Sequence, residues 1–424
     1  DIRNEIAWQY NDLGQVTTTW QSHEGLAVTS GGSESPKVQY SYDLSTSSSV
    51  YNDGGRLASV FYPSGREIRY DYAATAADSL HRVRYIRDSS DTNLVHHYYA
   101  GVRRLAVVTY SQANLRLFRG GPGDYGAFDR FGRIKDQFWD GFSGNPDADR
   151  FRYTYDFAGN RITRDYPAAL YSSDDKDQSY AYDGLHRLLD MKRGTLVSGS
   201  ITSPNFEQEW SLSQLGNWDN FVEKTSGTTT LDQDRAHNLA NEITNITTNT
   251  GSSWIIPAHD AAGNMTSAPS ANDPTKRHWY VYDAWNRLVE VWEDDGDSTK
   301  EITGGSPDDT LIARYEYDGQ SRRVAKEIYS GGVLDHKLHN YYNENWQILE
   351  IRKETGGSES PNPLKQYVWH TYYIDAPAIR YYDADTDGAG VETQYFTHDA
   401  NMNVTALTDD EGDVIERYDY TPYG

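Results

Sequence analysis

A tyrosine-rich motif recurs along most of the chain. In its clearest form the motif reads Tyr-x-Tyr-Asp, then Gly or Asn within a few residues, then Arg before an aliphatic residue. The clearest copies occupy residues 153–162, 180–188, 280–288 and 315–324. Weaker copies occupy residues 8–16, 128–134, 210–218, 237–243 and 259–265. The Asp-type positions recur at intervals from 22 residues (238 to 260) to 35 residues (283 to 318): Asp129, Asp156, Asp183, Ser213, Asn238, Asp260, Asp283, Asp318 and Asn343. Such spacing indicates a repeat array.

The physical chemistry of the motif predicts a β-hairpin. Tyr-x-Tyr places two rings on one face of a strand, because strand side chains alternate between faces. The following Asp or Asn starts a tight turn by accepting hydrogen bonds from its own backbone. Gly or Asn three residues later adopts the left-handed conformation that closes the turn. Arg-Leu or Arg-Val then restarts the alternation on the returning strand.

An array of such hairpins favours one continuous body. A single hairpin is marginally stable in water, but neighbouring hairpins can pair their edges and align their tyrosines. The product is a long twisted sheet that must coil or close to protect its edges. A chain of 424 residues would otherwise suggest two or three domains. We expect an all-β chain, since no long helical periodicity and no linker between unlike compositions is visible.

The composition supports a folded chain with water near both faces of its sheets. Only 37% of the residues are hydrophobic and the mean hydropathy is -0.79, values that lean toward disorder. The 34 Tyr, 11 Trp and 11 Phe argue against disorder, because disordered chains are poor in aromatics. A tyrosine ring buries apolar area while its hydroxyl stays hydrogen-bonded. A hollow shell or a thin solenoid suits such side chains better than a thick globular core.

The charge excludes two classes of partner. The 63 acidic and 39 basic residues give a net charge of -24, which makes attraction to nucleic acid or to anionic lipid unfavourable. The excess acid fits either a solvated surface or calcium binding. The chain has no Cys, which excludes disulfides and thiol chemistry. No stretch approaches the ~18 apolar residues of a membrane helix, so this segment is not expected to insert into a membrane. No signal peptide is visible, although the sequence begins at Asp1 without Met.

The motifs resemble the YD repeats of the Rhs and teneurin family, over nearly the whole chain. The C-terminal stretch carries the more specific similarity. Residues 366–369 with 373–375 are similar to the start of the conserved end of the family's core, and residues 396–407 are similar to its next section. Residues 416–424, ending Tyr-Asp-Tyr-Thr-Pro-Tyr-Gly, match the point where Rhs cores finish. We therefore divide the chain into a YD-repeat array over residues 1–365 and a core-end segment over residues 366–424.

The resemblance implies both a fold and a role. The implied fold is a strip of tandem hairpins spiralling into a shell- or barrel-like cocoon. The implied role is that of a secreted or cell-surface bacterial protein whose shell holds or presents a variable, toxin-like C-terminal segment. The alternative is a cell-surface adhesin or a filament subunit without a toxin, whose partners would be other surface proteins or copies of itself. Neither alternative implies a nucleic-acid partner.

The core end departs from the family at one position. Self-cleaving Rhs cores end in a motif resembling Asp-Pro-x-Gly, whose aspartates act as an aspartyl protease. Here Thr421 precedes Pro422, and Asp419 lies two residues out of place. A carboxylate pair that shares a proton needs both members in position. We therefore expect no enzymatic activity, and self-cleavage is the single catalytic alternative.

One acidic loop is a candidate metal site. Asp383, Asp385 and Asp387 with Gly388 read Asp-x-Asp-x-Asp-Gly, a spacing that brings carboxylates together around a hard cation such as Ca²⁺. The twelfth loop position is Gln394 rather than the bidentate Glu of an EF-hand, and no flanking helices are expected. The alternative is an ion-free polar loop.

The histidine pairs lack a metal-binding context. His96 and His97 would point to opposite faces of a strand and so would not chelate one ion together. His336 and His339 stand outside any HExxH motif. We predict packing or surface roles for these residues.

Overall fold

The computed structural model of the chain is built from antiparallel β-strands. It describes residues 3–43, 55–72, 82–101, 104–120, 125–167, 175–296, 300 and 309–423, and no helix occurs among them. The strands form one sheet of 18 strands and one of 14. The prediction of an all-β fold made of tandem hairpins is confirmed.

The first sheet contains the strands up to residue 250. Its members are β1 (Glu5–Tyr10), β2 (Val16–Ser22), β3 (Lys37–Asp43), β4 (Arg56–Phe61), β5 (Glu67–Asp71), β6 (Tyr85–Asp88), β7 (Asn93–Ala100), β8 (Arg104–Tyr110), β9 (Leu115–Phe118), β10 (Asp136–Gly141), β11 (Asp149–Tyr155), β12 (Arg161–Asp165), β13 (Asp177–Tyr182), β14 (Leu188–Gly194), β15 (Phe206–Leu212), β16 (Trp218–Thr225), β17 (Thr228–His237) and β18 (Ile243–Thr250).

The second sheet contains the remaining strands. Its members are β19 (Ala258–His259), β20 (Met265–Pro269), β21 (Arg277–Tyr282), β22 (Leu288–Glu293), β23 (Thr310–Tyr317), β24 (Arg323–Ser330), β25 (Val333–Tyr342), β26 (Ile348–Thr355), β27 (Ser358–Glu359), β28 (Lys365–Trp369), β29 (Pro377–Tyr382), β30 (Glu392–His398), β31 (Val404–Thr408) and β32 (Val414–Arg417).

The hairpin at Asp183 shows how each motif folds. The Asp183 carboxylate accepts hydrogen bonds from the backbone N–H groups of Leu185 (2.8 Å) and Arg187 (2.9 Å), and it also pairs with the Arg187 guanidinium (2.7 Å). The backbone N–H of His186 donates to the carbonyl of Asp183, which closes the turn, and His186 has a φ of 64°. Ala181 pairs with Asp190 and Tyr182 with Leu188, so the returning strand carries one extra residue, a β-bulge, close to the turn.

The left-handed residue always stands three positions after the Asp-type residue, but it is not always Gly or Asn. Gly132, Gly159 and Asn286 fit the expectation, with φ values of 83°, 99° and 60°. Ser321 (φ 64°) and Trp346 (φ 63°) occupy the same position in other hairpins. The carboxylate or amide cap holds the turn firmly enough that a side chain is accepted where Gly would be unstrained.

A second repeated bond joins many of the hairpins to the one before. The Tyr that directly precedes the turn donates its hydroxyl to the first carbonyl of the previous hairpin's returning strand. The donor–acceptor pairs include Tyr42 to Val16 (2.8 Å), Tyr182 to Arg161 (2.9 Å), Tyr282 to Met265 (3.0 Å), Tyr342 to Arg323 (2.7 Å) and Tyr420 to Val404 (2.8 Å). Trp369 replaces Tyr once and donates its indole N–H to Ile348 (2.8 Å). These bonds explain why the position carries Tyr rather than Phe.

The chain divides into two compact units. Unit 1 comprises residues 1–150, 317–325 and 336–421, and unit 2 comprises residues 151–316, 326–335 and 422–424. The division proposed from the sequence, at residue 365, stays a prediction. Of the predicted core end, residues 366–424, residues 366–421 lie in unit 1 with residues 1–150, and residues 422–424 belong to unit 2.

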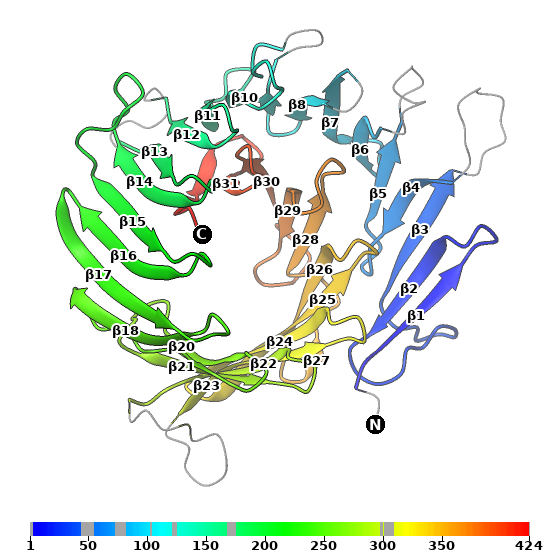
Figure 1. Cartoon of the computed structure of the whole chain (residues 1–424). Helices are drawn as coiled ribbons and strands as arrows, with labels where there is room; N and C mark the ends of the chain where they lie inside the picture. Colours follow the sequence, from blue (N-terminus) through cyan, green and yellow to red (C-terminus); the bar gives the residue numbers. More distant parts are fainter. Residues whose placement is uncertain are drawn as a thin grey trace. The chain divides into compact units, whose positions relative to one another are not determined.

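Unit 1 packs strands from both sheets around one core. Strands β1 to β10 pair successively (Figure 1), and so do β28 to β32. Val38, Ile68 and Val108 from the first sheet are fully buried in one cluster with Ile379 and Ala378 from the second. Residues some 300 positions apart in sequence therefore share a core, which stabilises the unit through apolar burial.

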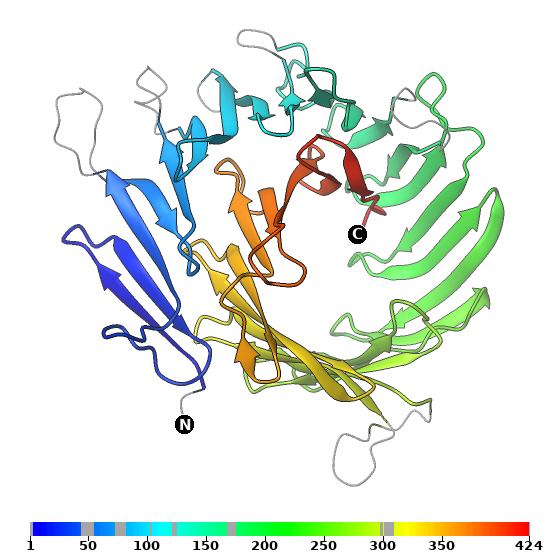
Figure 2. The ribbon, with the colours of Figure 1, turned by 180° about the vertical axis from the view of Figure 1, so that it is seen from behind.

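Unit 2 is held by smaller aromatic clusters. Strands β13 to β18 pair in sequence order and lie side by side in Figure 2. Trp210 and Phe221 stack on each other and share one buried cluster with Met191 and Leu231. The weak motif copies at residues 210–218 and 237–243 form regular hairpins here, as expected.

Candidate functional site

The Asp383 loop brings its three carboxylates together. It follows β29, and oxygens of Asp383, Asp385 and Asp387 lie within 4.8 Å of one another. Asp383 is buried, and its carboxylate accepts hydrogen bonds from the backbone N–H groups of Thr386 (3.0 Å) and Gly388 (2.9 Å). Asp385 and Asp387 are exposed. The geometry accords with both the calcium site and the ion-free polar turn, so calcium binding stays a prediction.

The core end places Asp419 at the surface. Asp419 is exposed and accepts a hydrogen bond from the backbone N–H of Tyr420 (3.1 Å). Thr421 is also exposed, and Gly424 lies outside the described residues. Self-cleavage is therefore neither supported nor contradicted by this geometry, and its absence stays a prediction.

The histidine positions reveal polar contacts between the two sheets of unit 1. His97 of β7 is buried while His96 is half-buried, consistent with opposite faces. A ring nitrogen of His97 lies 3.2 Å from one of His370, whose other nitrogen contacts the Tyr110 hydroxyl at 2.8 Å. The ring of His398 lies 5.9 Å from that of His370.

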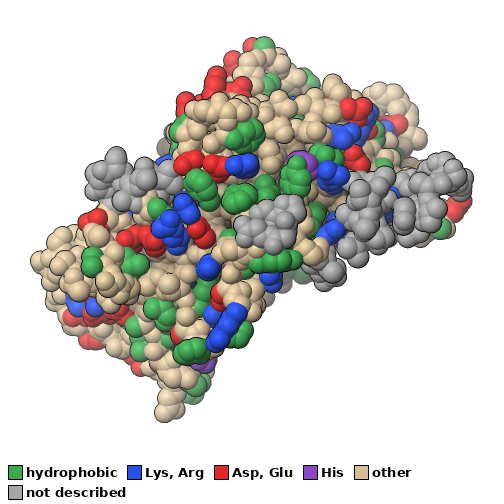
Figure 3. All heavy atoms as spheres, turned by 90° about the horizontal axis from the view of Figure 1, so that it is seen from above, with side chains coloured by type: hydrophobic (Ala, Val, Ile, Leu, Met, Phe, Trp, Pro, Cys, Tyr) green, Lys and Arg blue, Asp and Glu red, His purple; other side chains and the backbone are tan. Residues whose placement is uncertain are grey.

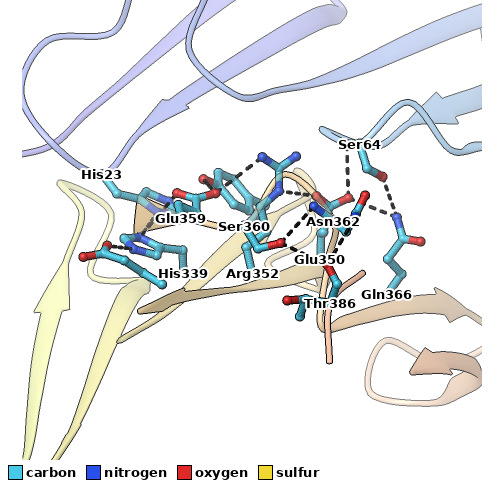
Figure 4. Close-up of polar contacts among 12 residues, drawn as sticks. His23, Ser64, His339, Glu350, Arg352, Glu359, Ser360, Asn362, Gln366 and Thr386 are labelled. Atoms are coloured by element: carbon cyan, nitrogen blue, oxygen red, sulfur yellow. Dashed lines mark hydrogen bonds and ion pairs between the residues drawn. The ribbon is translucent and has the colours of Figure 1, made fainter. Parts of the chain in front are cut away.

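A second set of contacts joins the sheets about His23 and Glu350 (Figure 4). The Nδ1 atoms of His23 and His339 lie 3.0 Å apart, and Nε2 of His339 contacts Glu354 at 2.7 Å. Fully buried Glu350 accepts hydrogen bonds from Arg352 (2.6 Å).

Glu350 also reaches across to the first sheet. It accepts from the Gln366 amide (3.0 Å) and from the backbone N–H of Ser64 (3.2 Å), which lies in the turn between β4 and β5. We call the polar and ring contacts formed by His23, Ser64, His97, Tyr110, His339, Glu350, Arg352, Gln366, His370 and His398 the polar seam.

Burial sets the protonation state of four seam histidines, His23, His97, His370 and His398. Burial lowers the pKa of His97 to about 3, and burial together with the nearby Arg119 guanidinium lowers the pKa of His398 to about 3. Burial, together with the neighbouring His97 and His398, lowers the pKa of His370 well below its ordinary value. Burial also lowers that of His23, next to His339. These side chains are neutral at pH 7 and join the sheets through neutral contacts.

The sequence gives little sign of the seam. In β26, Leu349 and Glu350 alternate as in a strand with one wet face, yet their side chains are 3% and 0% exposed. Both faces of this strand are covered, which periodicity alone does not reveal. His23 and His370 directly follow β2 and β28, His398 ends β30, and no local motif marks any of the three.

An aromatic cavity of about 610 Å³ lies inside unit 1. One wall comes from β3, β4, β5 and the residues after β5. The other comes from the turn at residues 343–347 and from residues 369–374. Its lining includes Tyr40, Tyr42, Tyr70, Tyr72, Trp369 and Tyr372.

The surface has no single dominant charge on the face drawn in Figure 3, where Lys and Arg side chains lie scattered among acidic and hydrophobic ones. Among the described residues, no helix is long and apolar enough to cross a membrane.

Comparison with known proteins identifies the fold. No family model and no curated protein matches the chain. Among solved structures, a TcdB2-TccC3 complex aligns with a TM-score of 0.67 and 13% identity over 98% of this chain and 20% of that chain. A Tc holotoxin pore of Photorhabdus luminescens aligns with a TM-score of 0.66 and 14% identity over 100% of this chain and 20% of that chain.

A third structure, TcdB2-TccC3 without its hypervariable C-terminal region, aligns with a TM-score of 0.56 and 11% identity over 98% of this chain. In each case the chain spans about a fifth of the matched protein's length, 20%. The chain therefore has an all-β fold shared with part of the Tc toxin complexes.

Proposed function

We propose that this chain is part of the encapsulating shell of a secreted or surface-exposed, bacterial Rhs-type protein. The shell would hold or present a variable, toxin-like C-terminal segment. The observation that carries the proposal is the alignment of 98% of the chain with a TcdB2-TccC3 toxin complex, TM-score 0.67. The YD motifs and the core-end motifs, which resemble those of Rhs proteins, support the same role.

Exposed apolar side chains at five turns of unit 2 support a polypeptide partner. Each of five turns presents one such residue, with exposed fractions as follows: Phe157 94%, Leu185 70%, Leu215 77%, Leu239 105% and Trp285 75%. Side-chain hydrogen bonds fix neighbouring turns, for example from Asn217 to Asn241 (2.9 Å) and from Arg187 to the Ser213 carbonyl (2.7 Å). Large apolar groups exposed on linked turns are candidates for contact with another polypeptide.

The same turns would also serve the alternative role, adhesion or assembly without a toxin. In either case the proposal assigns no catalysis to the chain. The reason for assigning no catalysis is Thr421, which occupies the position where the self-cleaving Rhs cores that this chain resembles have Asp.

Protease protection in the full-length gene product distinguishes these roles. The encapsulation proposal predicts a segment outside residues 1–424 that resists protease in the native protein. The same segment would be digested once denaturant has unfolded the repeats, which is the control. Rapid digestion of every segment outside the repeats in native protein would contradict encapsulation. Binding to cells or self-assembly by such a protein would then favour adhesion.

A further inference from the structure

We infer that the aromatic cavity of unit 1 is a binding site for a neutral saccharide. Its volume of about 610 Å³ lies in the range of cavities that hold small ligands. The inference is independent of encapsulation, because it concerns a small ligand held within one unit.

The aromatic rings of the cavity are fixed in place by hydrogen bonds at their polar ends. Tyr42 donates to the Val16 carbonyl (2.8 Å), Tyr72 to the Leu57 carbonyl (3.2 Å) and Trp369 to the Ile348 carbonyl (2.8 Å). The Tyr40 hydroxyl accepts from the backbone N–H of Glu344 (3.0 Å). The rings therefore offer fixed apolar faces, on which the C–H face of a pyranose can stack with little loss of side-chain entropy.

Two phenol groups remain for the ligand. Within the part of the chain that the structure describes, neither Tyr70 nor Tyr372 donates its hydroxyl to any acceptor, and the Tyr372 oxygen is buried. Leaving a buried hydroxyl without a partner costs free energy that a bound hydroxyl group would recover. The Glu344 carboxylate and the Asn345 amide supply further polar groups on the cavity lining.

The charge of the lining selects against other ligands. Among the described residues that line the cavity, Glu344 alone is charged, and no Lys or Arg is present. Phosphate, sulfate and carboxylate groups would meet no cation there, in a chain of net charge -24. A lone ammonium group would leave most of the volume empty, and Glu344 already accepts a hydrogen bond from Thr19 (2.7 Å). Hydroxyl-rich, uncharged rings satisfy both the stacking faces and the polar groups.

Titration calorimetry of the whole chain tests the site with maltotriose, cellotriose and N,N',N''-triacetylchitotriose. We expect saturable binding of at least one. In the Tyr70→Phe, Tyr372→Phe double variant, its affinity should fall about tenfold, the loss expected for two hydrogen bonds. The variant keeps both rings, so circular dichroism and the unfolding temperature should stay unchanged. Tyr10→Phe is the matched control, because Tyr10 is exposed and lies outside the cavity.

Three results would overturn the inference. They are absence of saturable binding by all three trisaccharides, undiminished affinity in a folded double variant, and variant-sensitive binding of tetramethylammonium alone. The last result would identify an aromatic site for cations instead. Protease protection of a cargo segment does not enter this experiment, so the two proposals fail separately.

Discussion

At the scale of the residue, the motif uses two polar side chains for two different connections. The Asp-type residue caps its own turn, as Asp183 does for Leu185 and Arg187. The Tyr before it fixes the neighbouring hairpin, as Tyr282 does through the Met265 carbonyl. The array thus depends on polar contacts at positions that a globular protein would fill with aliphatic side chains.

The Tyr contact is tested by two substitutions in one motif. Tyr282→Phe removes the bond to Met265 and should lower the free energy of unfolding by about 1 kcal/mol. Tyr280→Phe removes a hydroxyl for which the described structure shows no acceptor, and it should cost less than about 0.5 kcal/mol. Urea denaturation of both variants measures the difference, and equal effects would contradict this role for Tyr282.

Two turn ion pairs with the same hydrogen-bond geometry differ in how deeply they are buried. The Asp318 and Arg322 side chains are 1% and 2% exposed, whereas those of Asp183 and Arg187 are 18% and 29% exposed. Asp318→Asn should cost about 3 to 5 kcal/mol, because a buried guanidinium loses its carboxylate. Asp183→Asn should cost about 1 kcal/mol or less. Asn keeps the turn cap, as Asn343 does for Asn345 and Gln347, so thermal unfolding reports the ion pair alone.

At the scale of the element, the sequence predicted hairpins well and missed the contacts between them. Alternation and turn chemistry are local, so even the degenerate motif at residues 210–218 was recognisable. The pairing of Glu350 with Ser64 and Gln366, and that of His97 with His370, depends on which strands meet across the core. Local sequence does not encode that information. The Asp383 loop was found for the opposite reason, since its three carboxylates lie within five consecutive residues.

The polar seam predicts loss of stability in acid. The pKa of His398 is about 3 in the folded chain, below the value near 6.5 of an unfolded histidine. The unfolded state therefore binds more protons between these pH values. The contribution of neutral His398 to the free energy of unfolding is complete above pH 6.5 and declines as the pH falls toward 3. The pKa of His97, also about 3, implies the same direction.

His398→Leu isolates that effect. When the pH falls from 6.5 to 5, the free energy of unfolding should decrease in both proteins. The decrease should be smaller by about 1 to 2 kcal/mol in the variant than in the wild-type chain, as measured by denaturation at each pH. His237→Leu, in unit 2 and outside the seam, is the control. Equal acid sensitivity of wild type and His398→Leu would contradict proton exclusion at this side chain.

Calcium binding at the acidic loop has a direct test. The calcium hypothesis predicts saturable Ca²⁺ binding by calorimetry, lost in the Asp385→Asn, Asp387→Asn variant, which leaves the Asp383 turn bonds in place. Asp410→Asn, in a separate acidic group with Asp409 and Glu411, is the matched control. Absence of saturable binding would establish the alternative, an ion-free polar turn.

At the scale of the whole molecule, repeated polar contacts act together with apolar burial. The described strands join into sheets of 18 and 14 members, far beyond the size of an ordinary open sheet. Tyr-to-carbonyl bonds, turn caps and aromatic clusters recur along these sheets, which accounts for a mean hydropathy of -0.79 in a folded chain.

The most direct measurement is a cryo-electron microscopy reconstruction of the full-length gene product. Encapsulation predicts density for a polypeptide segment outside residues 1–424, enclosed by the repeat sheets and in contact with turn residues such as Leu239. Sheets that enclose no polypeptide, in molecules joined to one another through those same turns, would contradict the shell and favour an adhesive or filamentous assembly.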